Sequence, residues 1–445
     1  MKIPNCVKIA IQLLEKSGFE AYAVGGCVRD TVLKKIPNDW DICTNALPEQ
    51  VIKVFKDYHV FETGLKHGTV TVRIEHNSLE ITTFRTDGEY SDHRRPENVS
   101  FVTSLEEDLS RRDFTVNALA FSERTGIIDK VNGLADIENK IIRCVGNAKK
   151  RFDEDALRIL RCLRFASVLG FDIEEKTSKA VHNQKELLKL ISSERIKEEL
   201  LKLLCGKNVV KILTEYKDII AVIIPEIEDT FGFRQENPHH CYDVYTHTVI
   251  SVGYVKNNPI LRMIMLLHDI AKPKTFKLDE NGVGHFKLHP LIGSDMADVI
   301  LRELKFDNIS RKYICDQILE HDNRFPDNEK TVRRFISKHD YNFYFDHLEI
   351  RRADTLAQSE YLRKYKLDEI KVKNKIGEKL LAENATLKLK DLAINGKDLL
   401  DLGYPQGAIL KTILKSCLEK VVDKELENQK TVLIKYVLDN YEKEN

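Results

Sequence analysis

The sequence predicts an α+β protein, with a small α/β region holding a mixed sheet at the N-terminal end and helices thereafter. Two observations predict this architecture. Residues 1 to about 140 alternate short apolar strands with helices, and beyond residue 141 the apolar residues recur at helical spacing. A chain of 445 residues is long for one domain. This length suggests two to four domains, and the changes of pattern along the chain divide it into four, at residues 1–140, 141–208, 209–360 and 361–445.

The composition favours a protein without membrane spans and without a strong charge bias. The 70 basic and 70 acidic residues cancel, which argues mildly against a nucleic-acid binder, although a binder needs a basic face only where a phosphate backbone runs. No apolar run approaches the roughly 18 residues of a membrane helix. The nine cysteines form no CxxC pair, so we expect reduced thiols and a cytoplasmic location.

The first elements predict a strand that carries paired carboxylates. Residues 1–22 have apolar positions at helical spacing and predict an amphipathic helix, not a signal peptide. A buried strand follows at Ala21–Val24, and a second strand is expected to hold Asp39 and Asp41. Side chains two apart on a strand point to the same face. Two such carboxylates repel each other unless a cation lies between them, and hard oxygen ligands suit Mg²⁺.

Between these strands lies a Gly25–Gly26 turn and a short helix that carries Arg29. Such a turn lets backbone N–H groups, that of Gly26 among them, approach a phosphate at the start of a helix. A lone DxD or a lone GG is most often a solvated loop. The combined order of strand, GGCVRD, short helix and DWD is far more specific.

This combined pattern resembles the nucleotidyltransferase superfamily that includes bacterial CCA-adding enzymes and bacterial poly(A) polymerases. The resemblance implies nucleotidyl transfer with Asp39 and Asp41 as the catalytic, Mg²⁺-binding pair. It implies that Gly26 and Arg29 bind the nucleotide.

The rest of the α/β region predicts a helix at Pro48–Asp57 and strands at Thr69–Ile74 and Leu79–Phe84. Glu80 lies on the second of these strands. By the resemblance it is a candidate third metal carboxylate, and the alternative is a surface glutamate. Residues 84–101 predict a long charged loop. This loop resembles the flexible loop that CCA-adding enzymes need for the last A addition.

The motif RRDFTVNALAF follows, and its Asp113 is expected to cap a helix that begins at Phe114. Arg112 resembles the family arginine that contacts the nucleotide triphosphate, and a guanidinium fork suits phosphate. Asp129 and Gly133 resemble the DxxxG element of the family, which implies a hinge or a domain support.

The helical run RFDEDALRILRCLRF places arginines every three residues beside an apolar stripe. One interpretation is a solvated helix face in which Asp155 and Arg158 form an ion pair. The other follows from the resemblance to the family motif EDxxR. Asp155 would accept from the amino group of cytosine or adenine, and Arg158 would donate to the ring nitrogen. Guanine and uracil would present a carbonyl to the carboxylate and be rejected.

Arg161 and Arg164 would then lie near the nucleotide and hold its base or its phosphates. The segment SSERIKEELLKLL resembles the last motif of the family. We expect Ser192 or Ser193 to cap its helix, in a supporting role.

The region after residue 210 resembles the HD metal-dependent phosphohydrolase domain. Its histidines and aspartates recur on predicted helices, and imidazole and carboxylate groups are common metal ligands. A single buried histidine is more often a satisfied core residue, but the ordered set is specific. The resemblance implies a site for a divalent metal of unidentified kind, with two further histidines for a second metal. The four ligands are His247, His268, Asp269 and Asp354, and the two further residues are His289 and His321.

Residues 361–445 predict Lys- and Glu-rich helices, with Pro405 and Gly407 marking a turn before a helix. In the family such a tail packs on tRNA, and a solvated helical hairpin fits the sequence equally well. The overall prediction is a tRNA nucleotidyltransferase that adds CCA with CTP and ATP, with HD hydrolysis as a second activity. The alternatives are a poly(A) polymerase, an A-only or CC-only enzyme, and a hydrolase whose head only holds RNA. The sequence leaves the oligomeric state open.

Overall fold

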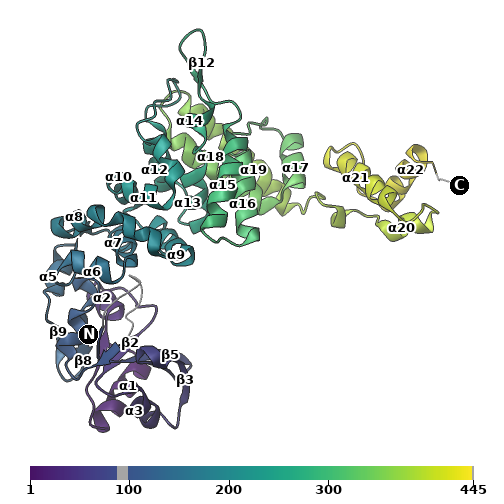
Figure 1. The fold of residues 1–445 in the computed structure, drawn as a ribbon. Coiled ribbons are helices and arrows are strands. Elements are labelled where there is room, and N and C mark those ends of the chain that lie inside the picture. The colour runs from purple at the N-terminus through teal and green to yellow at the C-terminus, as the bar shows by residue number, and fades with distance from the viewer. Residues whose placement is uncertain (88–98, 443–445) are drawn as a thin grey trace. The chain divides into compact units, whose positions relative to one another are not determined.

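The computed structural model describes residues 1–87 and 99–442. The chain forms two compact units. Unit 1 comprises Met1–Glu228 with Glu303–Lys305, and unit 2 comprises Asp229–Arg302 with Phe306–Asn445. The expected α+β class is confirmed, because a mixed sheet lies in unit 1 and the remainder of the described chain is mainly helical (Figure 1). The division into four domains stays a prediction.

Unit 1 is built on a seven-stranded sheet in the order β3-β4-β5-β2-β1-β8-β9. Strands β2 and β5 are parallel neighbours, and the other pairs of this sheet are antiparallel. Strands β6 and β7 form a separate antiparallel pair, and β10 and β11 a parallel one. The strands are β1 (Ala21–Val24), β2 (Asp41–Thr44), β3 (His59–Gly64), β4 (Thr69–Ile74), β5 (Asn77–Thr83), β6 (Arg85–Asp87), β7 (Val99–Phe101), β8 (Leu119–Ser122), β9 (Gly126–Asp129), β10 (Ile141–Ile142) and β11 (Asp172–Ile173).

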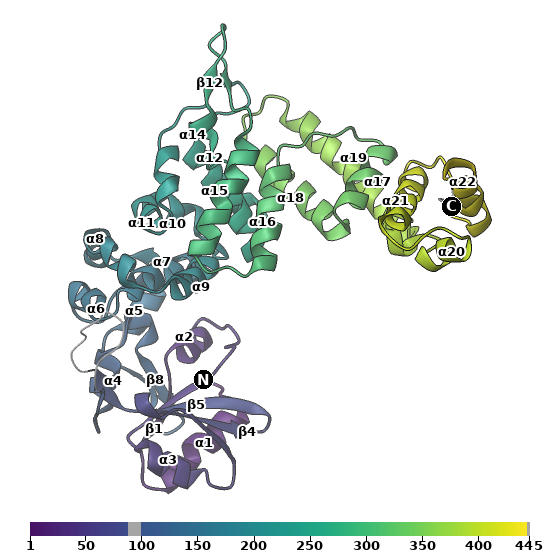
Figure 2. The same ribbon diagram turned by 45° about the vertical axis from the view of Figure 1, so that its right-hand side comes forward.

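Helices α1 and α3 cover one face of the sheet, and α2 lies on the other side (Figure 2). All four residues of β1 and of β8 are buried, so these strands form the centre of the core. The helices of unit 1 are α1 (Asn5–Lys16), α2 (Gly26–Val32), α3 (Pro48–Val54), α4 (Leu105–Ser110), α5 (Gly133–Glu138), α6 (Ala148–Glu154), α7 (Leu157–Leu169), α8 (Glu175–Asn183), α9 (Ser193–Leu204), α10 (Val209–Glu215) and α11 (Lys217–Ile223), with 3₁₀ turns η1 (Leu65–His67), η2 (Thr115–Asn117), η3 (Lys185–Leu190) and η4 (Pro225–Thr230).

Unit 2 is helical apart from a hairpin, β12 (Lys277–Leu278) and β13 (Gly284–His285), which projects from the helices in Figure 1. Its last three helices pack around a core of their own, which includes Leu399, Ile413 and Leu433. The helices are α12 (Val244–Tyr254), α13 (Pro259–Leu267), α14 (Lys272–Thr275), α15 (His289–Glu303), α16 (Asn308–Glu320), α17 (Glu329–Lys338), α18 (Tyr341–Ala357), α19 (Arg363–Ala382), α20 (Gly396–Asp401), α21 (Ala408–Val422) and α22 (Lys430–Asn440), with η5 (Leu389–Asp391).

Four predicted elements differ from the structure. Strand β2 begins at Asp41, so Asp39 lies in the segment before it and not on the strand. Helix α3 ends at Val54 and not at Asp57, and residues 55–57 form a turn. Strand β3, which follows this turn, was not predicted from the sequence. The loop expected at 84–101 is paired at its ends, where β6 meets β7. Residues 88–98 of that loop, and with them the predicted role in the last A addition, lie outside the described residues.

The fourth difference follows Asp113, where the expected helix is only the 3₁₀ turn η2. Phe114 forms an isolated antiparallel bridge with Cys144, which holds its backbone in an extended conformation. The chain must then enter β8, whose residues pair with both β1 and β9. Tertiary pairing therefore overrides the local helical pattern at this point.

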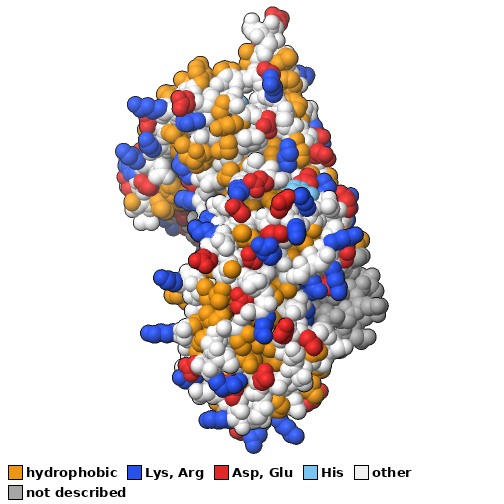
Figure 3. Space-filling model, turned by 90° about the vertical axis from the view of Figure 1, so that its left-hand side faces the viewer, with side chains coloured by type: hydrophobic (Ala, Val, Ile, Leu, Met, Phe, Trp, Pro, Cys, Tyr) orange, Lys and Arg blue, Asp and Glu red, His pale blue; other side chains and the backbone are white. Residues whose placement is uncertain are grey.

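The surface in Figure 3 carries basic and acidic side chains interspersed with apolar ones. The positive and negative charges, which cancel over the whole chain, are therefore also mixed locally on this face. No helix of the described residues is long and apolar enough to span a membrane.

Candidate functional site

The first candidate site lies where β2 and β5 run side by side in unit 1. Their register pairs Asp41 with Glu80, and Asp39 lies two residues before Asp41. All three residues are solvent-exposed. Partial desolvation of the Asp41 carboxyl, together with the charges of Asp39 and Glu80, raises the pKa of Asp41 to about 6. Carboxylates that raise a neighbour's pKa in this way repel one another, and a divalent cation would relieve the repulsion.

These carboxylates form an open set of ligands. Within residues 1–87 and 99–442, the groups of three His, Cys, Asp or Glu side chains whose ligand atoms all lie within 4.8 Å of one another are both in unit 2. The carboxylates of unit 1 are more widely spaced. Mg²⁺ keeps several waters and takes only one or two protein carboxylates, so the carboxylate oxygens of Asp39, Asp41 and Glu80 suit it as ligands.

The turn between β1 and α2 requires a glycine at residue 25. Gly25 has a φ of 86°, and a Cβ there would lie 3.2 Å from Nη1 of Arg112. Its N–H donates to the carbonyl of Leu119 at 3.0 Å. Gly26 begins α2 with a negative φ, and a Cβ there would meet the Arg29 guanidinium at an ordinary 3.6 Å. The turn therefore brings the backbone of Gly25 close to Arg112, so the motifs GGCVRD and RRDFTVNALAF meet at this point.

Arg112 is held by a buried carboxylate that the sequence analysis did not single out. Asp108 of α4 is 1% exposed, and it accepts from Arg112 at 3.1 Å and from Arg111 at 2.8 Å. Burial alone would raise the pKa of Asp108, but the charges of Arg112 and Arg111 lower it. Because Asp108 stays ionised, Arg112 is fixed beside the glycine turn.

Asp113 does not cap a long helix but connects the sheet region to α7. Its carboxylate accepts from Arg161 at 2.6 Å and 3.0 Å, from the Phe114 N–H at 2.8 Å and from the Asn117 amide at 3.2 Å. Asn117 in turn accepts from Arg29 of α2. Burial would raise the pKa of Asp113, but the Arg161 guanidinium lowers it to about 2. Asp113 is therefore an ionised, buried anchor between two predicted nucleotide-binding arginines.

In the structure Asp155 and Arg158 have other partners than the mutual ion pair of the solvated-face interpretation. Arg158 donates to Glu154 at 2.7 Å and to the carbonyl of Arg111 at 3.2 Å. Asp155 ends α6 in an extended conformation and faces Arg195 of α9 at 3.3 Å. Because Asp155 follows the end of α6 in an extended conformation while Arg158 lies on α7, their side chains point in different directions and meet different partners. Ser192 lies at the N-cap of α9, but its side chain makes no capping hydrogen bond.

Arg164 completes the arginine series of α7. Its Nε lies 2.7 Å from Glu199 of α9, a carboxylate that is 6% exposed. The series was expected to be a cationic stripe. In the structure Arg158, Arg161 and Arg164 each have a carboxylate partner, so the charge of this helix face is balanced within unit 1.

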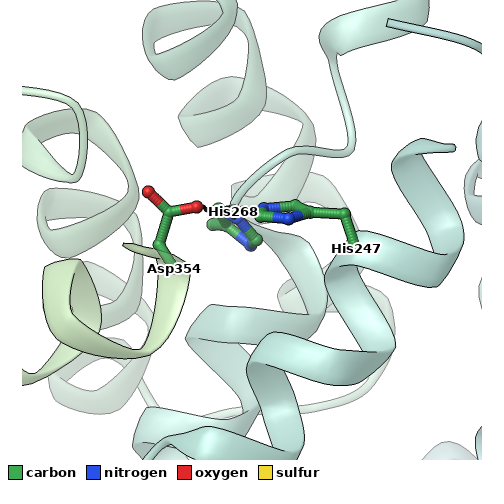
Figure 4. Close-up of side chains that lie close together, drawn as sticks. All are labelled: His247, His268 and Asp354. Atoms are coloured by element: carbon green, nitrogen blue, oxygen red, sulfur yellow. Dashed lines mark ion pairs between the residues drawn. The ribbon is translucent and has the colours of Figure 1, made fainter. Parts of the chain in front are cut away.

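The second candidate site lies in unit 2, where all six predicted HD residues come together. One group comprises His247, His268 and Asp354, and the other Asp269, His289 and His321. Figure 4 shows the first group, with the rings of His247 and His268 converging on Asp354. His247 Nε2 lies 2.9 Å from Asp354 and 3.4 Å from Asp269. Asp269 also lies 3.5 Å from His289, so it stands between the two groups.

The backbone orients the four histidines. Each Nδ1 lies beside a carbonyl oxygen, which can only accept, so Nδ1 donates to the backbone and Nε2 faces the other residues of the site. The Nε2 atoms of His289 and His321 lie 3.2 Å apart. The contacts are His247 with Ala357 at 3.3 Å, His268 with Met265 at 2.7 Å, His289 with Phe286 at 2.7 Å and His321 with Ile318 at 2.6 Å.

Two ring nitrogens of this site, Nε2 of His247 and Nε2 of His268, are buried without a hydrogen-bond partner. Buried polar atoms are normally satisfied, and exceptions call for an explanation. Imidazole Nε2 atoms that converge on one another and on carboxylates are the arrangement that a divalent metal completes. The residues present therefore fit a metal in each group.

A cleft of about 290 Å³ opens onto this site, and Arg324, Lys287 and Gln358 line it with the metal-site residues. The buried Lys272, three residues after Asp269, lies 2.7 Å from its carboxylate and donates to Gln235 at 2.8 Å. Burial would raise the pKa of Asp269, but His268 and Lys272 lower it well below its usual range. The sequence analysis missed Lys272, although its i+3 spacing from Asp269 was a usable signal.

Several polar partners were also missed in unit 1. Asp108, Glu154 and Glu199 hold arginines that the sequence analysis named, yet each is an ordinary acidic residue in a charged helix. Only the fold brings Glu199 to Arg164. Asp129, by contrast, lies as expected, since its carboxylate accepts from the Gly133 N–H at 2.9 Å and supports the start of α5.

Comparison with family models gives three matches along the chain. Residues 21–143 match the model described as "Poly A polymerase head domain". Residues 170–230 match "Probable RNA and SrmB- binding site of polymerase A", and residues 286–437 match "tRNA nucleotidyltransferase domain 2 putative". The first match contains the glycine turn, the carboxylates and Arg112.

Curated relatives match over either almost the whole chain or about half of it. A CCA-adding enzyme of Lactobacillus helveticus is 35% identical over 429 residues, which is 96% of this chain and 95% of that protein. One from Ligilactobacillus salivarius is 36% identical over 439 residues, 97% of this chain and 96% of that protein. The CCA-adding enzyme of Lactobacillus delbrueckii subsp. bulgaricus is 50% identical over 216 residues, and that alignment spans 48% of this chain and 53% of the relative.

Solved structures similar to this chain also include CCA-adding enzymes. The crystal structure of the Bacillus stearothermophilus CCA-adding enzyme in complex with CTP is 28% identical, covers 99% of this chain and 98% of its own, and has a TM-score of 0.72. The Thermotoga maritima CCA-adding enzyme complexed with tRNA is 19% identical and covers 98% of this chain and 95% of its own, with a TM-score of 0.60. At that identity the second likeness concerns the fold.

Proposed function

The chain belongs to the family of bacterial CCA-adding enzymes, which are nucleotidyltransferases, and from that premise we propose that it adds or repairs the 3′-terminal CCA of tRNA. Its substrates would be tRNA, CTP and ATP, with Mg²⁺ as cofactor and pyrophosphate as product. The observation that carries the proposal is the pairing of Asp41 with Glu80 on parallel strands, with Asp39 beside them. The nine free cysteines suit a reducing, cytoplasmic setting.

In this proposal Asp39 and Asp41 hold Mg²⁺, with Glu80 as a further ligand. When bound, the metal activates the terminal ribose hydroxyl of the tRNA and stabilises charge on the phosphates. Gly26, Arg29 and Arg112 hold the triphosphate, because a guanidinium offers planar donors that match phosphate oxygens. The hydrogen bond from Arg112 to the buried Asp108 supports this role, since it holds the guanidinium beside the glycine turn.

Asp155 and Arg158 choose the base in the proposal, and Arg161 and Arg164 stand near the nucleotide. Arg158 is anchored by Glu154, which supports a fixed donor direction. The Asp155 carboxylate pairs with Arg195 through Oδ2 and accepts from the Leu157 N–H through Oδ1, and each oxygen has a further acceptor position for a base amino group. A carboxylate with a guanidinium can accept cytosine and adenine and repel guanine and uracil without a template.

The direct test is incorporation into a tRNA that lacks its 3′-terminal CCA. Purified protein with Mg²⁺ would receive CTP, ATP or both, and product length would be read on a gel. Two C additions with CTP and a single A with ATP are the expected result. Long A tails would instead indicate a poly(A) polymerase, and an A added only to a tRNA that already ends in CC would indicate an A-only enzyme.

We also propose that the six residues of unit 2 bind divalent metal and hydrolyse phosphoesters at tRNA 3′ ends. The unpartnered Nε2 atoms of His247 and His268 support this second activity, because they face carboxylates in a buried site. The test is hydrolysis of an oligonucleotide ending in a 2′,3′-cyclic phosphate, after the protein has been stripped by a chelator and resupplied with single metals. Absence of hydrolysis with every metal would reduce this site to a structural one.

A further inference from the structure

Three of the proposed nucleotide-binding arginines converge on one phenyl ring. Phe165 of α7 is 9% exposed, and the guanidinium carbons of Arg164, Arg29 and Arg161 lie over its ring at 4.0, 5.2 and 5.4 Å from the centroid. Arg29 comes from α2, and the two other arginines come from the same helix as Phe165. A guanidinium within about 6 Å of an aromatic face is attracted by the ring quadrupole. One aromatic side chain therefore contacts cations from two separate motifs.

The ring is itself held in place from the sheet side. Phe114 meets Phe165 edge-on, with centroids 5.7 Å apart and an interplanar angle of 74°. Phe114 directly follows Asp113, whose carboxylate holds Arg161, and Asn117 of the same segment accepts from Arg29. Phe165 therefore lies at the junction of the glycine-turn helix, the RRD segment and α7.

Stacking on a ring leaves the in-plane donors of a guanidinium free to bond. Its five N–H groups lie in the guanidinium plane, so a carboxylate or phosphate can be bound at the edge while the face contacts the ring. Here Arg161 donates to Asp113 and Arg29 donates to Asn117, while Nε of Arg164 lies 2.7 Å from Glu199 as an ion pair. The ring adds attraction for three like charges that would otherwise repel one another.

We propose that Phe165 is a positioning residue of the nucleotide site, whose ring holds the guanidinium groups of Arg29, Arg161 and Arg164 in one preformed arrangement for the triphosphate. The proposal rests on the proposed nucleotidyltransferase function and adds a residue to it. Because these arginines would contact phosphates shared by CTP and ATP, loss of the ring should weaken both nucleotides equally. Base selectivity should not change, in contrast to substitution of Asp155.

The test compares Phe165→Leu, Phe165→Tyr and the control Phe171→Leu in the full chain. Phe171 is buried to a similar degree just beyond α7, and among the described residues no cation is placed over its ring. The measurements are KM and kcat for CTP and for ATP at saturating tRNA, CTP binding at equilibrium with Mg²⁺, and the thermal unfolding midpoint. Phe165→Leu is expected to raise both KM values by about tenfold, a loss within the range of such cation contacts.

Phe165→Tyr should restore both KM values to within about twofold, because tyrosine keeps the aromatic face. Phe171→Leu should lower the unfolding midpoint as much as Phe165→Leu does while KM stays unchanged. The proposal is overturned if the two leucine variants raise KM equally, or if the folded tyrosine variant behaves like the leucine variant. A wild-type protein that binds CTP but adds no nucleotide would refute the proposed function alone, and the binding series would still decide the role of Phe165.

Discussion

Asp41 is the residue whose replacement tests the transferase site most directly. Its carboxyl is flanked by Asp39 and Glu80, and its pKa is raised to about 6 by partial desolvation and by those charges. Asp41→Asn keeps the shape but removes a metal ligand. We expect kcat for nucleotide addition to fall by about 100-fold or more. Asp57→Asn, an exposed aspartate of the same region, is the control, and addition retained in the Asp41 variant would remove the metal assignment.

Asp155 tests base selection separately from triphosphate binding. The structure gives its carboxylate Arg195 as partner and gives Arg158 a different one, Glu154. If Asp155 rejects guanine and uracil by repulsion, Asp155→Ala should raise misincorporation of UTP and GTP relative to CTP by about tenfold or more. Competition assays with all four nucleotides measure this ratio. The control is Asp172→Ala, which removes a surface ion pair with Lys211, and unchanged selectivity in the Asp155 variant would refute the proposed base readout.

Among the elements of unit 1, the segment before η2 and helix α7 are joined by the ion pair of Asp113 with Arg161. Asp113 has a folded-state pKa of about 2, below the usual value for an aspartate. A depressed pKa contributes stability above the unfolded pKa of about 4, and that contribution is lost as the pH falls toward 2. At pH 7 it amounts to about 2 kcal/mol.

Asp113→Asn should therefore lower the free energy of unfolding by about 2 kcal/mol at pH 7. The difference from wild type should shrink as the pH falls from 4 to 3, because the wild-type carboxyl loses its charge during unfolding. Denaturant titrations at a series of pH values measure both effects. A difference that stays constant down to pH 3 would mean that the charge of Asp113 contributes nothing and that the variant only disturbs packing.

For the molecule as a whole, the sequence was informative where chemistry and local pattern coincide. The strand before Gly25 and the strand at Thr69–Ile74 are confirmed, because their residue types and spacing are specific. The six residues predicted for an HD site lie together in two groups, and their role stays a prediction. The prediction of a helix after Asp113 was wrong, because the pairing of β8 with two neighbouring strands outweighs the local helix propensity. The partners of the arginines were not predicted for a related reason, since Glu199 reaches Arg164 only through the packing of α9 on α7.

The two candidate sites lie in different compact units, so each should be removable without the other. The nucleotide residues belong to unit 1, and the six HD residues belong to unit 2. Asp269→Asn removes the carboxylate that stands between both histidine groups. We expect this variant to lose bound divalent metal, measured by elemental analysis, and to lose phosphoester hydrolysis.

Addition of CCA by the Asp269→Asn variant should stay within about twofold of wild type, because no residue of the transferase proposal is altered. Asp298→Asn is the matched control, since it changes a surface aspartate of unit 2 that is paired with Arg302. The converse variant, Asp41→Asn, should keep its metal in unit 2 and its hydrolysis. If Asp269→Asn abolished addition in a protein whose unfolding midpoint is unchanged, the two activities would be coupled, and the assignment of independent sites to the two units would be wrong.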